Sequence, residues 1–122
     1  MYTVLVIDDD KDILTVVELI LRANGFEVKS TDHWQDTFSS IVSFNPAIIL
    51  LDIALGGEDG RNISRQIKSN SKTEHIPVVL FSANHNAAKN LGNSLANDFL
   101  AKPFEADILV KTIMNNLPMH LA

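Results

Sequence analysis

The chain has 122 residues, a length typical of one globular domain with its own hydrophobic core. Hydrophobic residues make up 46% of the sequence and charged residues 20%, which excludes an intrinsically disordered or fibrous protein. There is no cysteine, so disulfides and zinc–thiolate sites are excluded as well. The net charge of −5 argues against direct binding of nucleic acid, because phosphate binding needs a positive face.

The sequence carries no sign of a membrane segment or of an export signal. Its apolar runs fall well short of the roughly 20 residues that span a bilayer. The N-terminus enters an apolar run directly, without a basic region or a small-residue cleavage site. We therefore expect a single domain over residues 1–122, located in the cytoplasm and without a membrane partner.

Short apolar runs and amphipathic stretches alternate along the chain. Three of the runs, Thr3–Ile7, Ala47–Leu51 and Val78–Phe81, are apolar on both faces, which is typical of strands buried in a parallel sheet. The predicted strands are, in chain order, Thr3–Ile7, Phe26–Ser30, Ala47–Leu51, Val78–Phe81 and Phe99–Ala101.

Each predicted strand is followed by a predicted helix. These helices are Lys11–Asn24, Asp32 or His33 to Phe44, Arg61–Asn70, Asn86–Asn93 and Glu105–Leu117. The helix at 86–93 is rich in asparagine and contains a glycine, both weak helix formers, so we expect it to be short or mobile. This strict alternation predicts an α/β fold in which right-handed crossovers build a parallel, doubly wound sheet.

Polar residues stand where four of the predicted strands end. Asp8 and Asp9 follow the first strand, Asp52 the third, Ser82 the fourth and Lys102 the fifth. In open parallel sheets, ligands bind outside the carboxyl ends of the strands. These side chains are therefore expected to converge at one edge of the sheet.

Such a cluster indicates a particular chemistry. Carboxylates that lie a few ångströms apart raise one another's pKa, and they stay ionised together only if cations compensate their charge. Lys102 supplies one positive charge, and oxygen ligands without histidine or cysteine suit Mg²⁺, or Mn²⁺ in its place. A metal ion, a lysine, a hydroxyl donor and a carboxylate nucleophile together predict phosphoryl transfer.

Four segments carry a resemblance to a known family. They read VLVIDDD at 4–10, LLDIALGGEDG at 50–60, VVLFSA at 78–83 and DFLAKPF at 98–104. In this order and spacing the chain resembles the receiver domain of bacterial two-component response regulators over essentially its whole length. The resemblance implies a (βα)5, flavodoxin-like fold, with a five-stranded parallel sheet of order 2-1-3-4-5 and helices on both faces.

The resemblance also implies roles for the acidic residues. Asp52 takes the place of the phosphoacceptor, which receives a phosphoryl group from a phosphohistidine donor. Asp8, Asp9 and Asp52 would hold Mg²⁺ or Mn²⁺, with the backbone carbonyl of Ala54 as a further ligand. The phosphohistidine would belong to a sensor histidine kinase or to a phosphotransfer protein.

Three further residues take their expected roles from the same resemblance. Lys102 would pair with a phosphoryl oxygen. Ser82 stands where the family has its switch threonine or serine, and Phe99 stands at the position of the switch aromatic residue. The Lys102–Pro103 peptide bond is expected to be cis.

The implied function is a phosphorylation-controlled signalling switch. It would be no enzyme beyond its own phosphorylation and dephosphorylation. A homodimer or an effector complex would form through the face of residues 86–93, 99–101 and 105–117. The sequence leaves open whether the domain stands alone or is part of a longer regulator or hybrid kinase.

The chain departs from the family pattern at three places. Gly56 stands where the loop after the phosphoacceptor usually has a proline, and Leu95 replaces a glycine before the fifth strand. The stretch from Ser82 to Lys102 is also slightly shorter than expected. The last two differences fall near the output face and leave the acidic cluster intact.

Two other functions compete with the signalling switch. A phosphatase of the haloacid dehalogenase type would use Asp8 as its nucleophile, within the Asp-x-Asp pattern of residues 8–10. Against it, Asp12 stands where that family has threonine or valine. The other alternative is an interaction module that docks to its partner independently of phosphorylation.

Overall fold

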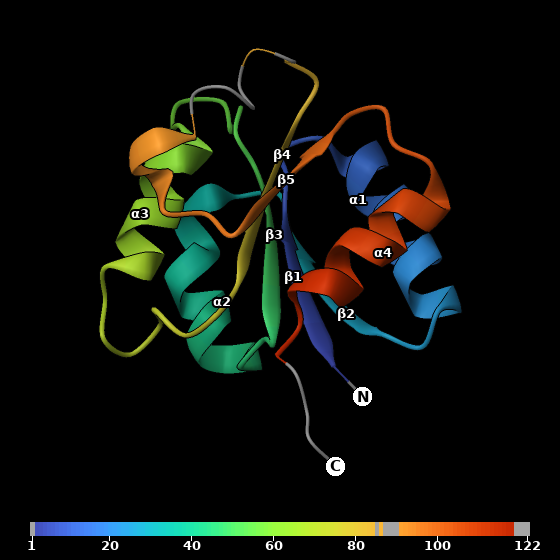
Figure 1. Ribbon diagram of the computed structural model, residues 1–122, viewed down its shortest axis with the longest axis horizontal. Helices are drawn as coiled ribbons and strands as arrows, with labels where there is room; N and C mark the ends of the chain where they lie inside the picture. The colour runs from blue at the N-terminus through green and yellow to red at the C-terminus, as the bar shows by residue number, and fades with distance from the viewer. Residues whose placement is uncertain (1, 85, 87–90, 119–122) are drawn as a thin grey trace.

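A computed structural model describes residues 2–84, 86 and 91–118 of the chain. Five parallel strands form one sheet in the order β2-β1-β3-β4-β5, which confirms the predicted fold class and strand order (Figure 1). The strands are Thr3–Ile7 (β1), Glu27–Thr31 (β2), Ile48–Asp52 (β3), Val78–Ser82 (β4) and Asp98–Ala101 (β5).

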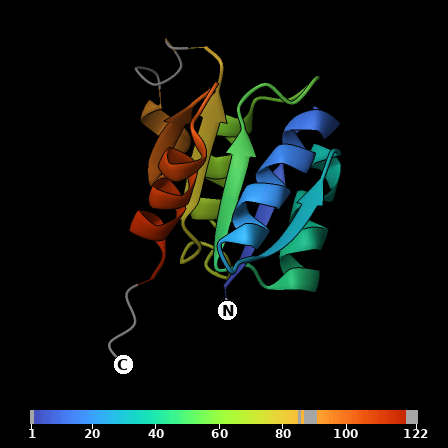
Figure 2. The same ribbon diagram turned by 90° about the vertical axis from the view of Figure 1, so that its right-hand side faces the viewer.

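Helices cover both faces of the sheet. Helices α2 and α3 lie on one face, and α1 and α4 lie on the other (Figures 1 and 2). The helical segments are α1 (Lys11–Ala23), η1 (Trp34–Asp36), α2 (Thr37–Phe44), α3 (Gly60–Lys68), η3 (Gly92–Ser94) and α4 (Ala106–Asn116), of which η1 and η3 are 3₁₀ turns. None of the described helices is long and apolar enough to cross a lipid bilayer.

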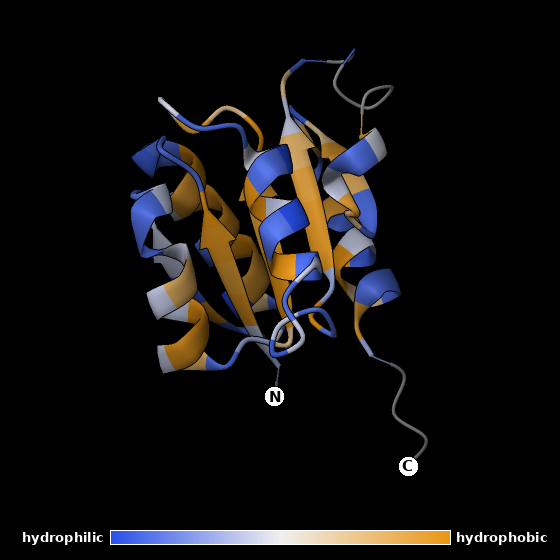
Figure 3. Ribbon diagram, turned by 90° about the vertical axis from the view of Figure 1, so that its left-hand side faces the viewer, coloured by the Kyte–Doolittle hydropathy of each residue, from blue (hydrophilic) through white to orange (hydrophobic). Residues whose placement is uncertain are grey.

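The central strands carry an unbroken apolar run, followed at the carboxyl end by the polar site residues, because each strand contributes to two hydrophobic cores. In β3, Ile48 and Leu50 pack among the residues that face α1 and α4, whereas Ile49 and Leu51 pack on the side of α2 and α3. All four side chains are fully buried. Figure 3 shows the hydrophobic colour concentrated in the strands, while the helices alternate between hydrophobic and hydrophilic residues.

The second predicted helix begins later than expected. The α-helix starts at Thr37 rather than at residue 32 or 33, and Trp34–Asp36 forms a 3₁₀ turn before it. The Thr37 hydroxyl donates a hydrogen bond of 2.6 Å to the Trp34 carbonyl, which stabilises the tighter turn. The ends of the other described α-helices and of all five strands lie within two residues of their predicted positions.

Half of the fourth predicted helix, residues 87–90 of 86–93, lies outside the described part of the chain. At its C-terminal end the prediction is wrong, because Gly92–Ser94 forms a 3₁₀ turn. Ser64 on α3 holds this turn through a hydrogen bond of 2.8 Å from its hydroxyl to the buried Ser94 carbonyl.

Gly60, the first residue of α3, lies against the backbone of β3. Its N–H donates a hydrogen bond of 2.8 Å to the Ile53 carbonyl. A Cβ at this position would overlap the carbonyl oxygen of Asp52 and would lie only 2.9 Å from the carbonyl carbon. Glycine therefore allows α3 to start directly beside the end of β3.

We expect Gly60→Ala to lower the free energy of unfolding by about 1–3 kcal/mol, because the added methyl group forces the backbone of β3 and α3 apart. Urea unfolding measures this loss. Gly92→Ala is the matched control, since a Cβ at Gly92 meets nothing within 4 Å. Equal stability of the two variants would contradict the close approach of α3 to β3.

Leu95 has a left-handed backbone conformation, with φ +60° and ψ +15°. Its side chain is 52% exposed, so packing offers little compensation for this conformation. A leucine in the left-handed region is strained, because its Cβ crowds the neighbouring backbone. Glycine, which the resemblance predicts at this position, would adopt the same backbone conformation without this strain.

We expect Leu95→Gly to be more stable than Leu95→Ala by about 1 kcal/mol, since only glycine relieves the strain. Both variants remove the exposed leucine side chain, so their difference isolates the backbone effect. Thermal unfolding followed by circular dichroism measures it. An alanine variant as stable as the glycine variant would refute the strain at Leu95.

Candidate functional site

Lys102 connects two acidic residues at the carboxyl edge of the sheet. It follows β5, and its Nζ lies 2.7 Å from Asp8 Oδ2 and 3.5 Å from Asp52 Oδ2. Asp8 has no exposed surface, and Asp52 is only 4% exposed. Buried carboxylates need compensation by charge or by hydrogen bonds, and Lys102 supplies it to both.

Asp9 completes a cluster of three carboxylates with Asp8 and Asp52. Each residue contributes one oxygen, and these oxygens lie within 4.8 Å of one another. Asp9 is exposed to solvent. The Asp10 N–H donates a hydrogen bond of 2.9 Å to Asp8 Oδ1, which orients the Asp8 carboxylate. The predicted convergence of the strand ends is therefore present.

Asp52 titrates far from the ordinary range of an aspartate. Burial and then the negative charge of Asp8 raise its pKa from 3.8 to about 7, although Lys102 acts in the opposite direction. Between these two pH values the folded chain holds a proton at Asp52 that the unfolded chain has lost. Without a divalent cation, this site therefore destabilises the fold as the pH rises through that range.

The three carboxylates fit a hard divalent cation. Mg²⁺ prefers oxygen ligands and usually binds through one or two carboxylates together with water and phosphate oxygens. Asp8, Asp9 and Asp52 supply such oxygens from β1 and β3, and the exposure of Asp9 leaves the cluster open to solvent on one side. The role of the Ala54 carbonyl as a further ligand stays a prediction.

Phe81 is a site residue that the sequence analysis missed. Its ring lies under Lys102, with Nζ 4.3 Å from the ring centroid, a distance at which a cation is attracted to the face of an aromatic ring. Phe81 is fully buried and precedes Ser82 in β4. The apolar pattern of the strand predicted only that Phe81 is buried in the core. The strand pairing of β4 with β5 brings it beside Lys102.

The loop after β3 is shaped around the acidic cluster. Gly56 has φ +61°, a conformation closed to proline, and a Cβ there would lie 3.2 Å from Asp9 Oδ2. The proline that the resemblance predicts here could not adopt the conformation of Gly56. Ala54 pairs with Asp59 in an isolated β-bridge, and the Ala54 N–H lies 3.4 Å from Asp52 Oδ1.

Of the remaining predicted residues, Ser82 lies at the same end of the sheet, whereas Phe99 pairs with Leu80 in the middle of β4. Ser82 ends β4, is 6% exposed, and its hydroxyl oxygen accepts a hydrogen bond of 3.0 Å from the Asn84 N–H. Phe99 in β5 is half-buried and packs against the core on the side of α2 and α3. The Lys102–Pro103 peptide bond is cis, as predicted.

Comparison with solved structures shows the same architecture in response regulators. The receiver domain of NtrX from Brucella abortus is 32% identical, with a TM-score of 0.84, and the match covers 93% of this chain and 97% of that domain. A protein from Chloroflexus aurantiacus that was assigned to the response regulators is 29% identical, with a TM-score of 0.86 over 93% of this chain and 95% of its own.

Longer NtrX chains match as well, and there this chain corresponds to 26% of the NtrX length, with 32% identity and a TM-score of 0.86 over 95% of this chain. The family model described as the response regulator receiver domain matches residues 4–114. This match includes β2 to β5 in full, β1 from its second residue, and all the residues of the acidic cluster. The chain belongs to the response regulator receiver domain family.

Proposed function

We propose that this domain is a phosphorylation-controlled switch of a two-component phosphorelay, with Asp52 as its phosphoacceptor. The observation that carries the proposal is the contact of Lys102 with both Asp8 and Asp52 beside the exposed Asp9. Family membership supports it, because receiver domains act in such relays. Asp52 lies at the end of β3, within the cluster that it forms with Asp8 and the exposed Asp9.

The proposed reaction transfers a phosphoryl group from a phosphohistidine to Asp52. A carboxylate oxygen of Asp52 forms a bond to phosphorus while the nitrogen–phosphorus bond of the donor breaks. The electron pair of that bond stays on the histidine nitrogen, which then takes up a proton. Asp8 and Asp9 would hold Mg²⁺ with Asp52, and the bound ion would neutralise negative charge on the phosphoryl oxygens.

Lys102 is positioned to act on the phosphorylated state. Its ammonium group already lies within 3.5 Å of Asp52 Oδ2, so it can pair with a phosphoryl oxygen on the same side chain. Phosphorylation adds a charge of about −1.5 to −2 and three acceptor oxygens. The Ser82 hydroxyl, which accepts a hydrogen bond from the Asn84 N–H, would then move to donate its own proton to a phosphoryl oxygen, and Phe99 would move into the space that Ser82 leaves.

The same proposal covers partners and location. The phosphoryl donor would be a sensor histidine kinase or a phosphotransfer protein in the cytoplasm. Mg²⁺ or Mn²⁺ would be the metal cofactor. A homodimer or an effector would contact the face of β5, α4 and the segment before β5, and the domain would catalyse only its own phosphorylation and dephosphorylation.

The haloacid dehalogenase alternative receives less support from the site. Its nucleophile would be Asp8, yet Lys102 and the Asp10 N–H both engage the Asp8 carboxylate, which has no exposed surface. The Asp52 side chain keeps 6% of its surface exposed, and Lys102 lies farther from it, at 3.5 Å. Phosphorylation-independent docking is separated from the switch by comparing partner affinity before and after phosphorylation.

We expect Asp52→Asn to abolish incorporation of phosphate from acetyl phosphate and Mg²⁺, because the amide removes the nucleophilic carboxylate. The measurement is the intact mass of the protein after incubation with the donor. Wild type should gain one phosphoryl group, which hydroxylamine releases as expected of an acyl phosphate.

Asp107→Asn on α4 is the matched control, since it removes an exposed carboxylate away from the cluster. It should incorporate phosphate at the wild-type rate. Stoichiometric incorporation by Asp52→Asn would show that another residue is the phosphoacceptor. Turnover of a phosphate ester that depends on Asp8 and not on Asp52 would support the phosphatase alternative instead.

A further inference from the structure

A polar pocket lies between α3 and the segment that leads to η3, apart from the acidic cluster. Its volume is about 260 Å³. One wall is formed by the start of α3 and the other by the residues around η3. Its lining residues are Asp59, Arg61, Asn62, Arg65, Leu91, Asn93 and Ser94.

The charge of the pocket is positive although the chain as a whole is negative, with a net charge of −5. The described lining residues include two guanidinium groups, those of Arg61 and Arg65, and one carboxylate, that of Asp59. Asp59 binds Arg61 in a two-point contact, with Nε 3.0 Å from Oδ1 and Nη2 2.7 Å from Oδ2. The Asp59 carboxylate is thereby neutralised within the pocket wall.

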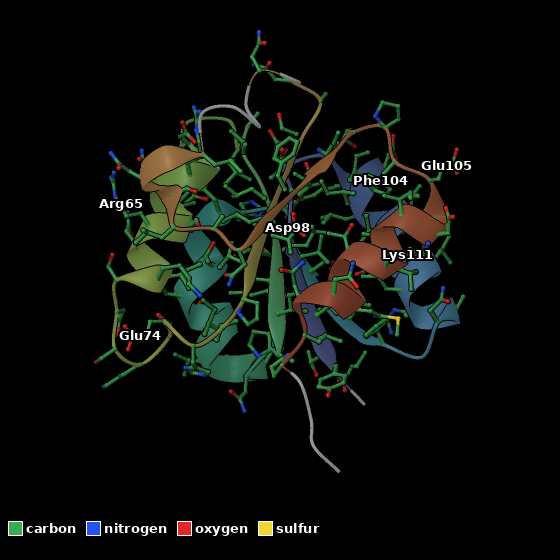
Figure 4. The ribbon with its side chains drawn as sticks, viewed as in Figure 1. Arg65, Glu74, Asp98, Phe104, Glu105 and Lys111 are labelled. Carbon is green, nitrogen blue, oxygen red and sulfur yellow. The ribbon has the colours of Figure 1, made fainter. Side chains whose placement is uncertain are left out.

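Arg65 supplies the remaining positive charge. It is exposed on α3, and Figure 4 shows its side chain extending away from the sheet next to the segment before β5. Within the described part of the chain, its side chain has a hydrogen bond of 3.3 Å to Asn62 Oδ1 and no carboxylate partner. A guanidinium group in this situation is suited to a phosphate, which it can bind through two parallel hydrogen bonds.

The other described lining residues offer mostly hydrogen-bonding groups. Asn62 and Asn93 carry amides and Ser94 a hydroxyl, whereas Leu91 is apolar. None of the described lining residues has an aromatic ring on which a base could stack. The volume suits a molecule of the size of a phosphorylated sugar.

We propose that this pocket binds a small hydroxylated phosphate monoester, with its phosphate on Arg65 and its hydroxyl groups on the side chains of Asn62, Asn93 and Ser94. The inference goes beyond the proposed phosphorelay function and is independent of it. Neither Mg²⁺ nor a phosphoryl donor takes part in this binding.

The test is a titration of the ¹⁵N-labelled protein with glucose 6-phosphate, followed by amide chemical shifts in the absence of Mg²⁺. We expect the shifts to change at residues 62, 65 and 91–94. Gluconate, glucose and inorganic phosphate are the comparison ligands. All three should bind more weakly, because each lacks either the phosphate or the hydroxyl groups.

Arg65→Gln should weaken binding of glucose 6-phosphate about tenfold, the usual effect of losing a charge-assisted hydrogen bond. Arg65→Lys should retain part of the affinity, since it keeps the charge and loses the two-point geometry. Lys72→Gln is the matched control, because it removes an exposed cation outside the pocket lining. It should bind as wild type does.

The proposal is overturned if glucose 6-phosphate leaves the shifts of residues 91–94 unchanged, or if Arg65→Gln binds it as tightly as wild type does. It is equally overturned if gluconate or inorganic phosphate binds as tightly as the sugar phosphate. Shifts confined to residues 8, 9, 52 and 102 would assign the phosphate to the acidic cluster instead. None of these results bears on phosphorylation of Asp52, which is tested separately.

Discussion

The ion pair between Lys102 and Asp8 is the interaction on which the site depends. It joins residues 94 positions apart, at a distance of 2.7 Å, and one partner is fully buried. The same ammonium group lies 3.5 Å from Asp52 and over the ring of Phe81. One positive charge thus compensates two buried carboxylates only in part. Burial, and then the negative charge of Asp8, raise the pKa of Asp52 against the opposite effect of Lys102.

The parallel sheet explains why such an unfavourable arrangement forms at all. Parallel pairing places the carboxyl ends of β1, β3, β4 and β5 at one edge, and the hydrophobic side chains on both faces of the sheet hold that register. The free energy from burying these strands offsets the cost of crowding the acidic residues. A divalent cation or a phosphoryl group can then change the balance of charge at the site without rearranging the sheet.

The sequence predicted those features of the structure that depend on a short stretch of chain and not on contacts between distant residues. Apolar runs predicted the strands, and the residues at their ends predicted the cluster of Asp8, Asp9, Asp52 and Lys102. Periodicity could not predict the 3₁₀ turn before Thr37, because a hydroxyl-to-carbonyl hydrogen bond decides it. Phe81 was missed for a similar reason: its contact with Lys102 depends on how β4 pairs with β5. The conformation of Leu95, too, is a property of the folded backbone.

The most direct test of this account is the pKa of the Asp52 carboxyl group, measured by ¹³C NMR titration with and without Mg²⁺. Incomplete compensation by Lys102 predicts a midpoint of about 7 without the ion. Saturating Mg²⁺ should lower that midpoint by more than about one pH unit, because a bound dication favours the ionised carboxylate. A midpoint near the ordinary value of 3.8 in both titrations would contradict the account.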